Sequence, residues 1–110
     1  MRVMHRIFRT LLVFVLLAAA GFAADFAEWR KKAETGDANA QFNLGVMYDN
    51  GMGVPKDLVQ AHVWLNIAGA KGHEIAKKNL EIAEKEMTSE QKAEAMKLAR
   101  ELFAKLPKGK

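Results

Sequence analysis

Residues 36–76 read GDANAQFNLGVMYDNGMGVPKDLVQAHVWLNIAGAKGHEIA, and this stretch decides the fold. Its apolar residues recur at spacings of three and four, which is the period of a helix that buries one face. Gly36 and Gly72 stand where a helix must end in a left-handed residue, a conformation that glycine adopts without a steric penalty. Asp57 and Gln60 have the spacing of a capping box at a helix start. We therefore expect helices over Asp37–Asn50 and Asp57–Lys71.

The same periodicity continues on both sides of this stretch. It predicts a helix over about Phe26–Thr35 and helical structure from Glu74 to the C-terminus, with a break near Thr88. Thr88 and Gln91 repeat the spacing of the capping box. Strand-like alternation of apolar and polar residues is hard to find after residue 24. The sequence predicts an all-α fold.

An internal repeat becomes visible when the predicted helices are aligned. Gly36, Ala40, Asn43 and Leu44 recur 36 residues later as Gly72, Ala76, Asn79 and Leu80. A period in the mid-thirties that is built from two helices is typical of an α-solenoid. We therefore expect a short α-solenoid of antiparallel helix pairs. The small residues Ala40 and Gly45 let two helices approach closely, while larger side chains fill the space between them, namely Leu44, Tyr48 and Trp64.

The pattern resembles the Sel-one-like repeat, a relative of the tetratricopeptide repeats. The repeat positions that carry the resemblance are Gly36, Ala40, Leu44, Gly45, Tyr48, Gly51, Gly53, Asp57, Ala61, Trp64, Ala68, Gly72 and Ala76. The chain departs from the family pattern at Gly69, where a second alanine is usual. It departs again after Leu80, because Glu81 and Glu84 occupy the places of Gly45 and Tyr48.

The second departure predicts where the solenoid ends. A repeat whose outer face is charged cannot accept another repeat, so we expect residues 74–87 and the helix from Ser89 to form a capping hairpin. The last helix has an apolar face, flanked by Met96 and Leu98, that consists of Ala95, Ala99, Leu102, Phe103 and Leu106. The helical-repeat domain, residues 24–110, then holds a half repeat, one full repeat over about 37–72, and this cap.

Residues 1–23 have the layout of a secretory signal peptide. Three arginines in the first ten residues precede the unbroken apolar run Leu11–Ala20, and small residues follow at Gly21 and Ala23. We expect cleavage after Ala23 and a periplasmic or secreted product. The alternative is an uncleaved N-terminal anchor, although the apolar run is about half as long as the roughly 20 residues that span a bilayer.

Charge and cysteine content narrow the function further. The chain has 17 basic and 13 acidic residues, and loss of the three signal-peptide arginines leaves 14 against 13, a net charge of +1. Nucleic-acid binding needs a clustered basic face, which such a balanced chain lacks. The chain has no cysteine, so it has no disulfide and no lipid-modified cysteine, and packing alone must hold the fold.

The sequence predicts no catalytic residue, no metal site and no cofactor. The hydroxyl groups after residue 23 that could act as nucleophiles belong to Thr35, Tyr48, Thr88 and Ser89, and capping explains all but the tyrosine. A zinc-protease helix that began at His73 would need its second ligand where Lys77 stands. Glu81 lies four residues from both Lys77 and Lys85, the spacing of ion pairs on a solvated helix face.

The resemblance implies a non-catalytic interaction module that holds a partner protein or peptide. Some exported relatives have been linked to binding or cleaving β-lactams, but those are rich in cysteine. These relatives nevertheless define the alternative function, a small periplasmic enzyme or ligand-binding protein that acts on cell-wall or β-lactam-like material.

A candidate binding surface follows from the helix geometry. Ala40, Leu44 and Tyr48 take the packing face of their helix, and steps of about 100° per residue leave other side chains to line a concave groove. Adding 36 gives the equivalent positions on the next helix, with Ile75 and Lys78 beside them. The predicted partner-binding residues are Asn39, Phe42, Asn43, Val46, Asn79 and Ile82. Asn43 and Asn79 would form a short asparagine ladder that can hold a peptide backbone. The alternative role for Phe42 is packing against the neighbouring helix.

Overall fold

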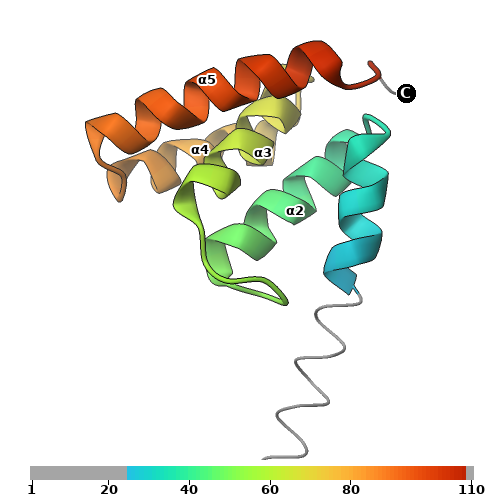
Figure 1. Ribbon diagram of the computed structural model, residues 1–110, viewed down its shortest axis with the longest axis horizontal. Coiled ribbons are helices and arrows are strands. Elements are labelled where there is room, and N and C mark those ends of the chain that lie inside the picture. Colours follow the sequence, from blue (N-terminus) through green and yellow to red (C-terminus); the bar gives the residue numbers. More distant parts are fainter. Residues whose placement is uncertain (1–24, 109–110) are drawn as a thin grey trace, which may run out of the picture.

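The computed structural model describes residues 25–108, and the described chain is all helical (Figure 1). A first helix covers residues 25–34. It is followed by α2 (Ala38–Asn50), α3 (Leu58–Ala70), α4 (Glu74–Lys85) and α5 (Ser89–Lys105). The predicted signal peptide, residues 1–23, lies outside the described residues. Within residues 25–108, no helix combines the length and the apolar character needed to cross a membrane.

The helix ends confirm the boundaries expected from the sequence. The Asp37 carboxylate accepts a hydrogen bond from the Ala40 N–H at 3.0 Å and so begins α2. Thr88 and Gln91 form a complete capping box at the start of α5. Asp57 accepts from the Gln60 N–H at 3.1 Å, but the described residues show no return bond from the Gln60 side chain. Gly36 and Gly72 have the predicted positive φ, 95° at each, and Gly51 and Gly53 in the turn after α2 also have positive φ, 67° and 74°.

Helix α3 lies at the centre of the fold and packs against α2, α4 and α5 (Figure 1). Its buried residues point in all directions around the helix axis: Ala61, His62, Val63, Trp64, Leu65, Ile67, Ala68 and Gly69. A helix that is apolar on every side is stable in water only when neighbours surround it. Packing against α3 therefore positions the other helices.

Two apolar clusters fill the space around α3. The larger one joins Trp64 to Leu44 and Tyr48 of α2, with Ala95 and Ala99 of α5. The first helix packs on the same cluster, and its Phe26 ring meets the Tyr48 ring edge to face with centroids 5.4 Å apart. The smaller cluster consists of Leu65, Ala68 and Ala76, covered by Phe42 and Leu80. The residues expected to fill the spaces between helices thus form the core.

The close approach of α2 to α3 depends on Gly45. A Cβ atom placed on this glycine would lie 2.8 Å from Cγ of Leu65 and 3.3 Å from the carbonyl oxygen of Ala61. Leu65 is only 1% exposed, so its side chain has no room to move aside. The prediction that Gly45 is a helix-contact residue is confirmed.

Helices α4 and α5 do not close on each other as α2 and α3 do. Counting from the N-cap of each helix, Glu81 takes the place of Gly45, and Met96 takes the place of Leu65. A glutamate side chain cannot fit where a single Cβ already overlaps its neighbour. The two helices accordingly rest on α3 while their backbones make little contact, and Met96 is 49% exposed. The predicted cap is present, but it is an open pair of helices.

The buried face of α5 differs from the expected one at Phe103. Ala95 and Ala99 are buried, and Leu98, Leu102 and Leu106 pack on the core, but Phe103 is 44% exposed. Steps of four residues drift by about 40° around a helix axis, so the row from Ala95 through Ala99 carries Phe103 to the edge of the buried face. Its placement on the packing face was wrong for this reason.

A buried histidine joins α3 to α4. His62 is fully buried, and its Nε2 atom lies 2.9 Å from Oε1 of Glu84, while its Nδ1 atom has no hydrogen-bond partner among the described residues. Lys77 pairs with Glu74 at 3.2 Å, and the ion pairs expected between Glu81 and its neighbouring lysines are not found in residues 25–108. The acidic face of α4 is therefore only partly solvated, because Glu84 contacts the core.

Two helical glycines provide a test of the close approach between α2 and α3. Replacing either Gly45 or Gly69 by alanine removes the same backbone entropy cost from a helix interior. The tight contact of a new Cβ at Gly69 would be with the flexible Lys77 side chain, with Cγ at 3.1 Å, whereas the one at Gly45 would meet buried Leu65. We expect Gly45→Ala to be less stable than Gly69→Ala by about 1–3 kcal/mol, the usual cost of overpacking a core.

The free energy of unfolding, measured by urea denaturation of both variants and the wild type, checks this expectation. Gly69→Ala should unfold at or above the wild-type midpoint. Equal stability of the two variants would show that α2 and α3 have space to spare at Gly45.

Candidate partner-binding surface

Phe42 and His73 bring α2 and α4 together. The Nδ1 atom of His73 accepts a hydrogen bond from the Ala76 N–H at 3.1 Å, so this side chain caps α4. Its ring also stacks on Phe42, with centroids 4.5 Å apart and an interplanar angle of 23°. Phe42 is half-buried and covers the smaller apolar cluster together with Leu80. Phe42 thus packs between the two helices, and only part of its ring is accessible to a partner.

The polar residues of the predicted surface are accessible. Asn39 is exposed, and Asn43, Val46 and Asn79 are half-buried. Among the described residues, neither Asn43 nor Asn79 forms a side-chain hydrogen bond, and none joins the two amides to each other. The predicted asparagine ladder is two separate amides at equivalent positions of α2 and α4, and neither amide bonds to another side chain or to the backbone within residues 25–108.

Two large apolar side chains on α4 are exposed. Ile75 is 57% exposed and Ile82 is 59% exposed. They lie seven residues apart, which is about two helical turns, so both stand on one side of α4 with Asn79 between them. We call the surface formed by Asn39, Asn43, Val46, Ile75, Asn79 and Ile82 the α2–α4 face.

Several contacts behind this face were not predicted. Gln41 is fully buried and donates from Nε2 to the Ala33 carbonyl oxygen at 3.1 Å, which ties α2 to the first helix. Lys71 donates from Nζ to the Gly36 carbonyl oxygen and so joins the two glycine turns of the repeat. The capping role of His73 could have been inferred from the repeat, because His73 stands 36 residues after the N-cap Asp37. Residues 25–108 hold no group of three side chains that could bind a metal ion.

Comparison with known proteins places this arrangement in a known fold. A family model described as the Sel1 repeat matches residues 38–73, which span α2, α3 and the turn before α4. A solved structure that is similar is a protective antigen present in uropathogenic Escherichia coli strains, which displays an SLR (Sel1-like repeat) fold. It shares 32% sequence identity with this chain and superposes with a TM-score of 0.75 over 77% of this chain. The similarity covers 18% of the length of that protein. No curated protein matches the chain.

The family resemblance seen in the sequence is confirmed by both findings. The fold is typically a non-catalytic scaffold for interactions between proteins. The chain is an SLR helical-repeat protein with a Sel1 repeat over residues 38–73.

Proposed function

We propose that this chain is an exported, non-catalytic adaptor that binds a partner protein or peptide through the α2–α4 face. The observation that carries the proposal is the combination of two unused amides, on Asn43 and Asn79, with two exposed isoleucines, Ile75 and Ile82. Exposed large apolar side chains that share one helix face are typical of interaction sites.

The chemistry of this face suits a peptide backbone. Each asparagine amide offers two N–H donors and one carbonyl acceptor, the groups that pair with backbone C=O and N–H. The isoleucines on either side of Asn79 add apolar contact, and burial of apolar surface is the main favourable term in most protein–protein association. The half-buried Phe42 ring stacks on His73 and so links α2 to the start of α4 behind this face.

The alternative, an enzyme or ligand-binding protein for cell-wall or β-lactam-like material, has less support. Such a protein needs several polar groups that converge in an enclosed pocket. The cavities along α3 and α5 are open to solvent and lined largely by apolar side chains, for example Ile67, Ala99 and Phe103.

Loss of the two amides tests the proposed binding face. The double variant Asn43→Ala with Asn79→Ala should bind a partner recovered from periplasmic extract about tenfold more weakly or worse, because each lost hydrogen bond contributes about 0.5–1.5 kcal/mol. Isothermal titration calorimetry with the recovered partner measures the change in Kd. The melting temperature should stay near that of the wild type, since neither amide bonds to another described residue.

Asn66→Ala serves as the matched control, because Asn66 is also half-buried but lies on α3, among the residues that line a different cavity. It should bind the same partner with wild-type affinity. Unchanged affinity in the double variant would exclude the α2–α4 face.

The proposed export predicts the start of the mature chain. Because small residues occupy Gly21 and Ala23 after the apolar run, the protein isolated from a periplasmic fraction should have the intact mass of a chain that begins at Ala24. A membrane-bound product that keeps residues 1–23 would contradict the cleavage and support the anchor.

A further inference from the structure

A groove runs along the junction of α3 and α5, away from the α2–α4 face. It consists of two cavities, of about 260 and about 270 Å³, that share Ile67 and Phe103. Its apolar lining also includes Ala70 of α3, Ala99 and Ala104 of α5, and the C-cap residue Leu106. We call it the α3–α5 groove.

The open cap leaves the α5 side of this groove accessible. Helices α4 and α5 make little contact with each other, and within residues 25–108 the side of α5 that carries Met96 and Phe103 is left open, so these residues are 49% and 44% exposed. Phe103 is the aromatic residue among the exposed large apolar side chains of the described chain. Partly exposed aromatic side chains in apolar grooves are the usual anchors of protein interfaces.

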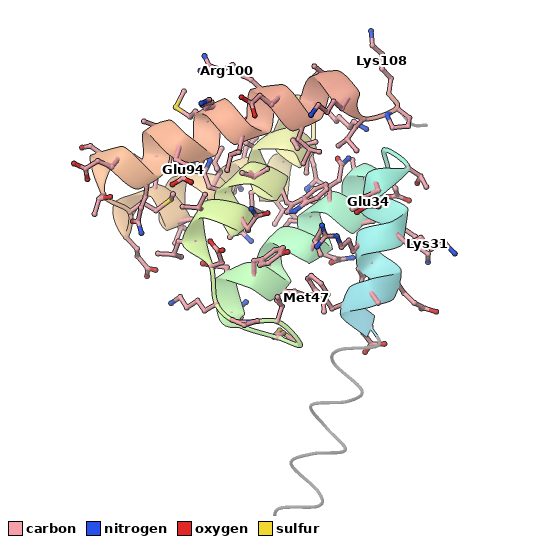
Figure 2. All side chains as sticks on the ribbon, in the orientation of Figure 1. Lys31, Glu34, Met47, Glu94, Arg100 and Lys108 are labelled. Atoms are coloured by element: carbon pink, nitrogen blue, oxygen red, sulfur yellow. The ribbon has the colours of Figure 1, made fainter. Side chains whose placement is uncertain are left out.

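The charged residues that line the groove are all basic. They are Lys71 just after α3, Arg100 on α5 and Lys108 beyond the end of α5, and none of the described residues that line either cavity is acidic. Figure 2 shows Arg100 on the side of α5 that faces away from α2, and Lys108 beyond the end of the helix. Arg100 forms no ion pair within residues 25–108. The acidic Glu101 lines a separate cavity on the opposite side of α5, with Leu98 and Leu102.

We propose that the α3–α5 groove binds an amphipathic peptide segment of another protein, with apolar side chains against the exposed Phe103 ring and a carboxylate near Arg100. The charge of the groove selects an acidic partner, because a positive surface attracts negative side chains and repels positive ones. A second copy of this chain would bring Arg100 and Lys108 against the same residues of its partner, which like-charge repulsion opposes. The groove and its occupant are independent of the partner assigned to the α2–α4 face.

The probe for this groove is a short, fluorescein-labelled amphipathic peptide. Its apolar face carries Leu and Phe at i, i+3, i+4 and i+7, the spacing of helical peptides that bind in grooves, and its polar face carries Glu. A second peptide has Lys in place of every Glu. Fluorescence polarisation with the purified protein measures both affinities at low and high salt.

The Glu peptide should bind at least about tenfold more tightly than the Lys peptide, and salt should reduce the difference because it screens exposed charges. Phe103→Ala should weaken the binding of the Glu peptide by about tenfold, as expected for an interface anchor. Arg100→Glu should weaken this binding by a similar factor. The matched control for Arg100→Glu is Lys97→Glu, which makes the same change of charge at an exposed residue of α5 that lines neither cavity. The Asn43→Ala and Asn79→Ala double variant should bind the Glu peptide like the wild type.

Circular dichroism melting curves of Phe103→Ala and Arg100→Glu confirm that these variants fold. Equal binding of the two peptides, no binding of either, or equal effects of Arg100→Glu and Lys97→Glu would overturn the proposal. So would a dimer in analytical ultracentrifugation that Phe103→Ala dissociates. Binding to phosphatidylglycerol vesicles through Phe103 without binding of the Glu peptide would assign the groove to a membrane and also overturn the proposal.

Discussion

The close contact between α2 and α3 at Gly45 is the constraint on which the structure depends. It brings the two helix backbones near enough for Leu65 to lie 2.8 Å from where a Cβ of Gly45 would be. This contact buries one side of α3, and α4 and α5 pack on other sides of the same helix. Trp64 and Leu65 point to different sides of α3, and each belongs to a separate apolar cluster. One helix therefore organises both clusters, which is how a chain without cysteine holds a repeat together by packing alone.

The second helix pair shows what happens when this contact is lost. Glu81 stands at the position equivalent to Gly45, and α4 and α5 separate although both remain on α3. The repeat is modified in the same helix by Glu84, which replaces a tyrosine position and meets the buried His62 at 2.9 Å. A repeat that no longer stacks thus keeps its contact with the core through a hydrogen bond instead of an aromatic ring. The separation also exposes the side of α5 that carries Met96 and Phe103, so the end of the solenoid and the α3–α5 groove have one structural cause.

Much of the fold could be predicted from the sequence because local rules govern it. Helix ends are set by residues close by in the sequence, here the capping residues Asp37 and Thr88 and the turn glycines. The repeat spacing then identifies which helices pair. The exposure of Phe103 could not be predicted, because it depends on the rotation of α5 over α3 rather than on periodicity. The same limit applies to the site: repeat register locates Asn43 and Asn79 on equivalent helix positions, whereas the stack of Phe42 on His73 arises only when the two helices are placed side by side. The partner-binding residues remain predictions, because a binding surface is defined by a molecule outside the chain.

The central role of α3 is tested most directly by native-state hydrogen exchange. The backbone amides from Trp64 to Ala68 should exchange most slowly of all and only through global unfolding, because this part of α3 holds deeply buried side chains of both apolar clusters. Amides in the last turns of α5, which border the open groove, should exchange through local opening at lower free energy. Faster exchange in α3 than in α2 or α5 would contradict the account, since it would mean that the surrounding helices are stable without the helix they are proposed to cover.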